Sequence, residues 1–308
     1  MKPFSVVSWR GVWFAISGIL VALSIVAIAV WGLRQGIEFT GGSLLVMRFE
    51  QRPTPAEAAA ELQRTPGVDV GSVVAQPVGE TDLQFRLRSL EGAESRQVVT
   101  HMTSAYAGST ELRFDAIGPV VGQELRKKSF QGLAVILVAI LLYVAYAFRK
   151  VSFPVKSWKY GLVTLLAAFH DIIIPLGVFA ALGHFYGMEI GTPFIAAILT
   201  IMGYSITDTI VVMDRIRENL QKTSGTFASV VDASIRQTAI RSFNTSMTTL
   251  LTLIAIFLFG GSSLHDFTLA LIIGIAVGTY SSIFVASPLL VTWDAWTRKD
   301  GRGKKAVA

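Results

Sequence analysis

The chain has 308 residues, of which 52% are hydrophobic and only 16% are charged. Soluble domains carry roughly 25% charged residues, so this composition excludes an ordinary soluble protein and indicates a membrane protein. The absence of cysteine excludes a disulfide framework, a thiolate nucleophile and a cysteine-ligated metal site. The net charge of +6 does not indicate nucleic-acid binding, because most basic residues lie in short loops beside long apolar runs.

The first apolar run, Val12–Trp31, follows a short basic lead and is long enough to cross a bilayer. A signal peptide has a shorter apolar core and ends at small residues, whereas this run ends at Gly32-Leu33-Arg34-Gln35. We therefore predict that residues 1–35 form a cytoplasmic N-terminus followed by an uncleaved membrane span.

Residues 36–127 contain the polar part of the chain and are predicted to form a small domain outside the membrane. Strands are indicated at Ser43–Glu50, Gly71–Gln76, Leu83–Arg88 and Glu111–Ala116. A capping box at Thr54 and Glu57 opens the first helix, and Glu94–Tyr106 forms the second. This order of elements, βαββαβ, predicts a ferredoxin-like α+β domain.

Residues 128–297 are predicted to form a bundle of five further transmembrane helices, which makes six in all. The predicted spans after the first are Phe130–Phe148, Gly161–Leu182, Ile190–Met213, Arg241–Phe259 and Phe267–Val291. In the fifth, the purely apolar part, Met247–Phe259, is too short to cross, so Arg241–Thr245 are expected near the headgroups.

Basic residues are concentrated after the second and fourth spans and in the tail, residues 298–308, whereas the connections 183–189 and 260–266 contain neither Lys nor Arg. Positive loops stay in the cytoplasm, so both termini are predicted to be cytoplasmic and residues 36–127 extracytoplasmic. One half of an RND-type transporter has this layout, since many transporters combine two related halves.

Asp208 is the most informative residue, because a carboxylate inside an otherwise apolar helix costs several kcal/mol and marks a functional site by default. Thr200, Tyr204 and Asp208 recur every four residues and form a polar stripe, with Ser205 beside it. A proton-titrating role and a purely structural carboxylate satisfied by its neighbours both fit this pattern.

Further polar residues lie in the third and fifth spans. Arg241 and Thr245 share one helix face, and Arg241 can pair with Asp208 or extend to lipid phosphate. His170 and Asp171 lie mid-span and point about 100° apart, so they are not expected to face one partner. His170 can relay protons, or it can be a neutral imidazole bonded to another helix.

The last span carries a row of small residues, Gly274, Gly278 and Ser282, which indicates close helix packing. No hydrolase, P-loop or dinucleotide-binding motif is present. An intramembrane aspartyl protease needs two facing carboxylates, and Asp171 and Asp208 are expected at different depths. No histidine or carboxylate pair has metal-ligand spacing. The sequence therefore predicts a protein that is not an enzyme and has no metal or cofactor.

Several motifs resemble those of the SecF type within the SecD/SecF protein-export family of the RND (resistance-nodulation-division) superfamily. They are Gly36-Ile37-Glu38-Phe39-Thr40-Gly41-Gly42-Ser43, Ile117-Gly118-Pro119-Val120-Val121-Gly122-Gln123-Glu124-Leu125, Ala168-Phe169-His170-Asp171, the run from Gly203 to Val212 with Asp214–Asn219, and Arg241-Ser242-Phe243-Asn244-Thr245-Ser246. Glu38 stands where the family usually has Asp, and Ser242-Phe243 replaces Thr-Leu.

The resemblance implies a subunit of the bacterial inner membrane that assists protein export through the SecYEG translocon, using the proton-motive force. It implies SecD, expected as a separate chain because this one starts at Met1, as the partner. It also implies contact with the translocating polypeptide and membrane lipid, with YajC as a further candidate partner. Asp208 and Arg241 fall at the family's coupling positions; protons are the expected coupling ion, and Na⁺ is not excluded. Half of an exporter of small solutes or lipids, or a structural membrane scaffold, are the alternatives.

Overall fold

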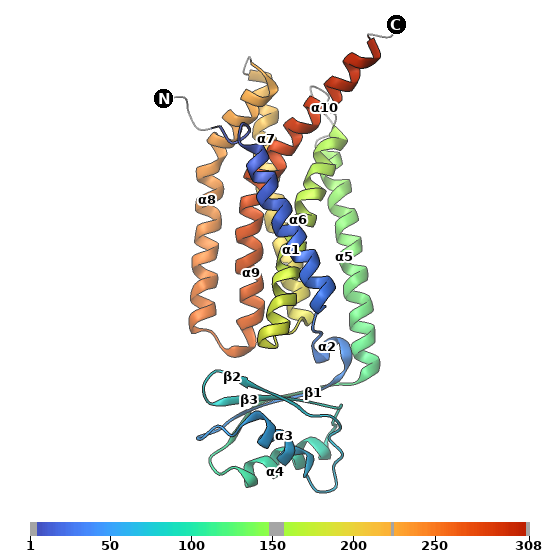
Figure 1. Cartoon of the computed structure of the whole chain (residues 1–308), viewed down its shortest axis with the longest axis vertical. Coiled ribbons are helices and arrows are strands. Elements are labelled where there is room, and N and C mark those ends of the chain that lie inside the picture. Colours follow the sequence, from blue (N-terminus) through green and yellow to red (C-terminus); the bar gives the residue numbers. More distant parts are fainter. Residues whose placement is uncertain (1–4, 148–156, 223–224, 306–308) are drawn as a thin grey trace. The chain divides into compact units, whose positions relative to one another are not determined.

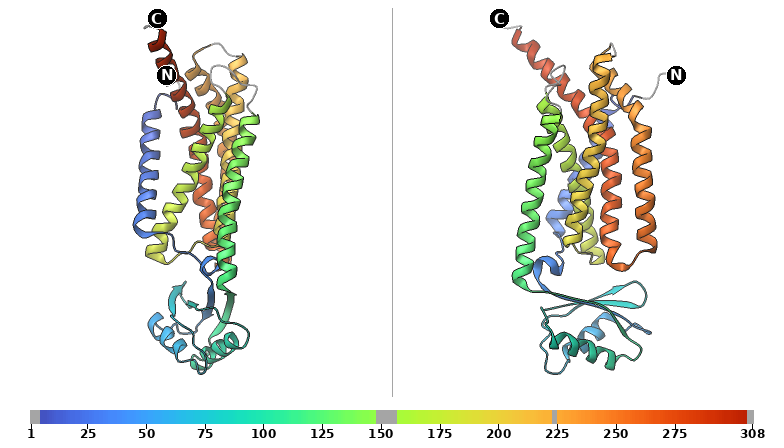
Figure 2. Two further views of the ribbon diagram at one scale, coloured as in Figure 1. Left: turned by 90° about the vertical axis from the view of Figure 1, so that its right-hand side faces the viewer. Right: turned by 180° about the vertical axis from the view of Figure 1, so that it is seen from behind.

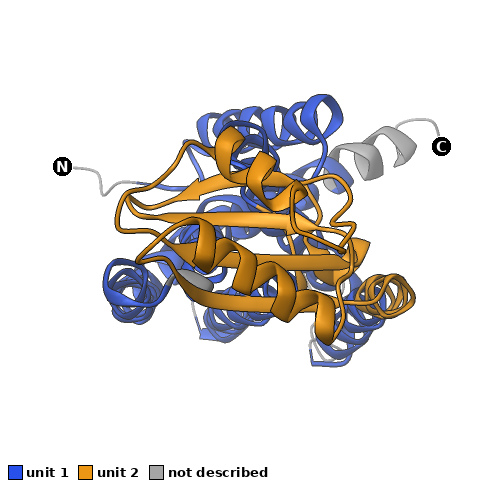
Figure 3. Ribbon diagram, turned by 90° about the horizontal axis from the view of Figure 1, so that it is seen from below, with its two compact units in different colours: residues 1–33, 132–188, 193–308 blue, residues 34–131, 189–192 orange. Residues whose placement is uncertain are grey.

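The computed structural model describes residues 5–147, 157–222 and 225–305. The chain divides into two compact units, which Figure 3 colours separately. Unit 1 contains Met1–Leu33, Gly132–Met188 and Pro193–Ala308, and unit 2 contains Arg34–Gln131 and Glu189–Thr192. The ends of unit 2 therefore differ from the predicted range, 36–127, and a short segment between two predicted spans belongs to it.

Six helical spans within the described ranges are long and apolar enough to cross a membrane, as the sequence predicted. They are α1 (Arg10–Trp31), α5 (Pro119–Ala147), α6 (Ser157–Tyr186), α7 (Thr192–Lys222), α8 (Phe227–Phe259) and a last span built from α9 (Ser262–Ser281), the π-helical turn η1 (Ser282–Ala286) and α10 (Ser287–Lys305). α8 and α9 run side by side in all the views of Figures 1 and 2.

The helices begin at other residues than the predicted spans, and the largest differences are at α5, which begins at Pro119 instead of Phe130, and at α8. The fifth was predicted from Arg241, but α8 already begins at Phe227, because the Thr226 side chain caps it by accepting a hydrogen bond from the Ser229 N–H at 3.3 Å. The fourth was predicted from Ile190, which instead forms backbone hydrogen bonds within unit 2. Phe148, the predicted end of the second span, lies outside the described residues.

Unit 2 has the predicted ferredoxin-like arrangement. Strands β1 (Gly42–Arg48), β2 (Val74–Val78), β3 (Asp82–Leu87) and β4 (Thr110–Ile117) form an antiparallel sheet in the order β2-β3-β1-β4. Helices α3 (Pro55–Gln63) and α4 (Ala93–Ala105) lie on the same face of this sheet (Figure 1). The alternating residues Leu45, Met47 and Phe85 point into the core between the two layers.

The two motifs that flank the sheet of unit 2 pack against each other through glycines. Gly41 and Gly42, next to the short helix α2 (Ile37–Thr40), have φ of +73° and +127°, which favour glycine. A Cβ on Gly41 would lie 2.7 Å from Pro119 Cα, and one on Gly122 would lie 2.8 Å from the Gly41 nitrogen. Both motifs therefore need glycine at these positions for the backbones to approach so closely.

The Glu38 side chain, on α2, fills a space between two further glycines. Its carboxylate lies so close to Gly36 and Gly191 that a Cβ on either would overlap it; for Gly191 the distance to Oε2 would be 2.7 Å. The longer acid at this position is thus accommodated by two residues without side chains.

The connection between α6 and α7 joins unit 2 through backbone and ionic contacts. The Ile190 N–H donates to the Arg34 carbonyl at 2.8 Å, and the Gly36 N–H donates to the Ile190 carbonyl at 2.9 Å. Glu189 forms an ion pair with Arg86 on β3 and lies 3.8 Å from the Arg34 Nε. As a result α7, which carries Asp208, starts at a residue of unit 2.

From the burial of Glu189 beside Arg86 and Arg34 we predict how the stability of unit 2 depends on pH. Burial raises the pKa of Glu189 in spite of the opposing effect of Arg86 and Arg34. The Glu189 carboxyl group therefore binds its proton more tightly in the folded state than in the unfolded chain. The stabilisation from protonated Glu189 is present at low pH and is lost as pH rises through the folded pKa. We expect Glu189→Gln to gain stability relative to the wild type as pH rises from about 4 to 8. Hydrogen exchange of the β1 and β3 amides, corrected for intrinsic rates, measures this difference.

Asp82 provides a control, because its pKa is shifted in the opposite direction to that of Glu189. The hydrogen bond from Arg48 holds the pKa of Asp82 below its ordinary value, so its stabilisation is present at neutral pH and is lost as pH falls. Asp82→Asn should therefore differ from the wild type most at neutral pH. A Glu189→Gln profile parallel to that of the wild type would contradict the assignment.

Candidate functional site

Asp208 lies on α7, where three helical elements meet. Its Oδ1 accepts a hydrogen bond from the Ser242 hydroxyl of α8, and its Oδ2 accepts one from the Ser282 hydroxyl at the start of η1. The side chain is half-buried. The polar environment that an acid needs inside an apolar bundle is thus provided by hydroxyl groups of two neighbouring elements.

Asp171, on α6, is a second acid and is completely buried. It accepts hydrogen bonds from the Ser281 hydroxyl at 2.7 Å and from the Ser205 hydroxyl of α7. The His170 Nδ1 lies 2.8 Å from its other oxygen. The expectation that His170 and Asp171 would not face one partner misses this contact, because the imidazole turns toward the carboxylate beside it.

The two acids have separate sets of hydrogen-bond partners that adjoin each other, and together we call them the carboxylate cluster: Asp171, Asp208, His170, Ser205, Ser242, Ser281 and Ser282. Ser281 and Ser282 are consecutive, and each donates to a different acid. The two carboxyl groups are therefore close in depth, which corrects the prediction from sequence. Within the described ranges, neither acid of the cluster forms an ion pair with a Lys or an Arg.

The expected ion pair between Asp208 and Arg241 is not formed within this chain. Arg241 is exposed on α8, and none of the ion pairs among the described residues includes it. The reason is geometric: Ser242, the next residue, points at Asp208, and consecutive helical residues point about 100° apart. Arg241 is thus near Asp208 in depth but faces away from it.

The remaining predicted residues occupy the border of the cluster. The Tyr204 hydroxyl lies 3.4 Å from the hydroxyls of Ser246 and Thr249 on α8 and does not contact Asp208. Thr245 is exposed, and its hydroxyl donates to the Arg241 carbonyl at 2.9 Å. Tyr204 thus connects α7 to α8, whereas Thr245 satisfies its own hydroxyl within its helix.

The row Gly274, Gly278 and Ser282 packs α9 and η1 on α7. Gly274 lies against Ile201, Gly278 against Ser205, and Ser282 bonds Asp208. A Cβ on Gly278 would lie 2.9 Å from the Ser205 Cβ. This close approach lets the Ser282 hydroxyl reach Asp208 on α7.

Sequence reasoning missed three of the serines. Ser242 and Ser281 were not selected, and Ser282 was identified only as a small residue. A serine beside a motif residue is a weak signal, because most serines in membrane helices donate to their own backbone. Among the described residues, no group of three His, Asp or Glu side chains could hold a metal ion.

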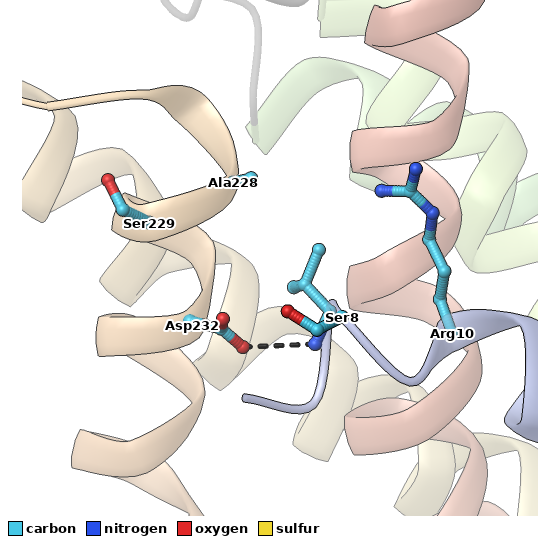
Figure 4. Close-up of a pocket in the computed structure, with 6 residues that line it drawn as sticks. Ser8, Arg10, Ala228, Ser229 and Asp232 are labelled. Carbon is cyan, nitrogen blue, oxygen red and sulfur yellow. Dashed lines mark hydrogen bonds between the residues drawn. The ribbon is translucent and has the colours of Figure 1, made fainter. Parts of the chain in front are cut away.

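A pocket at the N-terminal end of α8 is separate from the cluster. It is lined by Val7, Ser8, Arg10, Ala228, Ser229 and Asp232 (Figure 4). Asp232 accepts hydrogen bonds from the Val7 N–H at 3.0 Å and from the Ser5 hydroxyl. None of the predicted site residues lines this pocket, whose contacts attach the N-terminal segment to α8.

The packing at Gly278 predicts a selective effect of an added methyl group. Gly278→Ala should destabilise the purified chain by about 1–3 kcal/mol, because the methyl overpacks the contact with Ser205. Gly203→Ala, on the exposed side of α7 with open space around it, should be neutral or stabilising by up to about 1 kcal/mol from helix propensity. Thermal unfolding in detergent compares the two. Equal midpoints would show that the α7–α9 contact is not tight.

Comparison with protein families gives two matches. The family model for the C-terminal part of protein export membrane protein SecD/SecF matches residues 97–296, and the SecD/SecF GG motif matches residues 26–51. The second match covers Gly41 and Gly42, and the first covers the whole carboxylate cluster.

Individual relatives match nearly the whole chain. Protein translocase subunit SecF of Thermobaculum terrenum is 38% identical over 94% of this chain and 93% of its own length. Protein translocase subunit SecDF of Thermus thermophilus is 38% identical over 89% of this chain, which matches only 36% of that longer protein. The crystal structure of SecDF from Thermus aligns with a TM-score of 0.82 at 35% identity, covering 96% of this chain and 39% of that one.

Proposed function

We propose that this chain, which belongs to the SecD/SecF family of protein-export membrane proteins, is the SecF-type subunit that works with SecD to drive protein translocation through SecYEG with the proton-motive force. A role in protein export follows from the relatives. The observation that carries the proton-driven part is the pair of carboxyl groups held inside the bundle by hydroxyls rather than by a cation.

Hydroxyl partners suit an acid that changes its protonation state. A serine hydroxyl donates to an ionised carboxylate and can equally accept from a protonated one, so both states of Asp208 keep hydrogen bonds. An arginine partner would instead hold the carboxylate in the ionised form. Asp208 can thus load and release a proton without leaving an unsatisfied group in the bundle.

Arg241 supports the proposal of a partner in the membrane. It is exposed near the depth of Asp208 on a helix that is long and apolar enough to span the bilayer. A charged side chain at such a position is unfavourable in lipid and is found facing protein or water. We assign to the partner, SecD, a carboxylate that pairs with Arg241. The longer SecDF relative is consistent with this, because this chain matches only about a third of it.

The basic loops support an orientation with both termini in the cytoplasm of a bacterial inner membrane and unit 2 outside. Unit 2 would then meet the translocating polypeptide together with SecD, and YajC and lipid would contact the bundle. The start of α7 at Thr192, within unit 2, gives a covalent path from Asp208 to unit 2.

The energy available from one proton limits what a single proton can drive. One proton crossing about 150 mV yields roughly 3.5 kcal/mol. Shifting a two-state equilibrium from 1:99 to 99:1 takes about 5.5 kcal/mol. The electrical term of one proton is therefore not sufficient, so the pH gradient contributes or more than one proton moves per cycle.

Asp208→Asn tests the role of this carboxyl group. Because each uncoupled proton forgoes roughly 3.5 kcal/mol at about 150 mV, the gradient-dependent part of translocation should fall at least about tenfold. The assay is preprotein import into vesicles containing this chain, SecD and SecYEG, with and without a proton gradient. Omitting Na⁺ in the same assay discriminates the two candidate coupling ions.

Asp214→Asn is the matched control, because Asp214 lies on the same helix but is exposed and paired with Arg217. It should retain the full response to the gradient. An Asp208→Asn variant that also retains it would refute proton coupling at this residue and would favour the structural scaffold.

Arg241→Gln tests the partner contact. Truncating one side of a buried charge pair costs about 2–5 kcal/mol, so the affinity for SecD should fall roughly 30-fold or more. Arg236→Gln, on the same helix and also exposed, should leave it unchanged. Co-purification of tagged SecD at a series of concentrations measures both. Equal retention of the two variants would show that Arg241 does not lie at the interface.

A further inference from the structure

The His170–Asp171 pair is a buried acid and base that the Asp208 mechanism does not use. Asp171 is completely buried and His170 is 5% exposed. The pair lies in the middle of the bundle core, on the most buried face of α6. An isolated charge at such a place costs several kcal/mol, so the pair favours the state in which its net charge is zero.

An ionised Asp171 carboxylate beside a neutral His170 imidazole has a net charge of −1. The pair therefore reaches zero net charge when it binds one additional proton. The proton can be placed on the carboxyl group, or on the imidazole, which then has both nitrogens protonated. The His170 Nε2 is buried and has no hydrogen-bond partner among the described residues, while Nδ1 faces Asp171. One nitrogen is thus oriented by the acid, and the other is unoccupied and able to take up a proton.

The groups around the pair come from α7 and α9 and include no further cation within the described ranges. They are Ser205 on α7, Ser281 on α9 and the Tyr280 ring of α9, which stacks on the imidazole with 6.3 Å between centroids. The Tyr280 hydroxyl is itself bonded to the Trp13 carbonyl and to Ser17 on α1. The other acid of the carboxylate cluster is Asp208, whose donor Ser282 follows Ser281 in the chain.

Asp171 and Asp208 accept hydrogen bonds from two consecutive serines, and the helix α7 that carries Asp208 also carries a donor to Asp171. On α7, Ser205 donates to Asp171 and lies three residues before Asp208. At the junction of α9 and η1, Ser281 donates to Asp171 and its neighbour Ser282 donates to Asp208. Gly278 of α9 packs directly against Ser205, and this contact leaves no space for α9 to move closer to α7.

The start of η1 is also a place where the backbone can rearrange. π-helical turns are rare, appear mostly as single turns within α-helices, and are frequent at functional sites. The Ser281 hydroxyl is shared between Asp171 and the Gly278 carbonyl at 3.1 Å, and the Ser282 hydroxyl between Asp208 and the Thr279 carbonyl at 3.1 Å. A protonated acid can donate to its serine, which then donates only to its own backbone carbonyl, and the two serines that make this change are consecutive residues.

We propose that His170 and Asp171 form a second proton-binding site, coupled to Asp208 through Ser205, Ser281 and Ser282. The site takes up one proton from water, which forms an N–H bond on His170 or an O–H bond on Asp171. On release that bond breaks, the proton returns to water, and no other covalent bond changes. It deepens the proposed function by adding a second proton to the cycle, and it rests on that function for the role of Asp208.

Infrared spectroscopy of the full chain in nanodiscs tests the coupling, because protonated carboxyl groups have a resolved C=O band. The bands are titrated with pH in the wild type and are assigned with Asp171→Asn and Asp208→Asn. We expect the Asp171 midpoint to shift by about one pH unit, a tenfold change in proton affinity, in Asp208→Asn. The Asp208 midpoint must shift by the same amount in Asp171→Asn, since coupling is reciprocal.

Two further variants keep the test decisive. Ser281→Ala retains both acids and should reduce the mutual shift, and His170→Gln assigns the Asp171 band if Asp171→Asn does not fold. Asp232→Asn, in the pocket at the N-terminal end of α8, should shift neither midpoint. Independent titration of the two acids, or no titration of the His170–Asp171 pair between about pH 4 and 9, would overturn the inference. An Asp208 band that never titrates while the pair does would instead overturn the proposed role of Asp208.

Discussion

Two carboxyl groups inside an apolar helix bundle must be given hydrogen-bond donors, and the packing of α7 against α9 meets this requirement. The glycine row of α9 removes the side chains that would hold the two helices apart. At that short separation the hydroxyls of Ser281 and Ser282 reach Asp171 and Asp208. Close packing and acid solvation are therefore linked, because a wider separation of α9 and η1 from α6 and α7 would take one serine donor away from each acid.

The kind of donor has consequences for what the acids can do. Hydroxyl groups satisfy a carboxyl group in either protonation state, whereas the guanidinium of Arg241 lies on another face of α8. Charge and acid are thus near each other in depth but separated in direction. Both acids therefore have their hydrogen-bond donors within this chain, and the guanidinium of Arg241 is exposed on α8.

Much of the fold follows from periodicity and composition. Alternation in the strands and the capping box at Thr54 predicted the ferredoxin-like unit, since these signals are local. The start of α8 could not be found in the same way, because Phe227–Ile240 is too polar for hydropathy to detect, although Thr226 caps it. Asp208 was evident from its cost in lipid, but its partners were not, because contacts between distant helices leave no periodic trace in the sequence.

The fit of Glu38 between Gly36 and Gly191 links the composition of two loops that are far apart in the chain. Glutamate has one methylene more than aspartate, and the volume for it comes from the two absent Cβ atoms. An alanine at either glycine would displace the end of the Glu38 side chain, whereas it would fit beside a shorter acid, so the three positions share one volume. In homologous sequences, a change of size at position 38 would accordingly be accompanied by a compensating change at position 36 or 191.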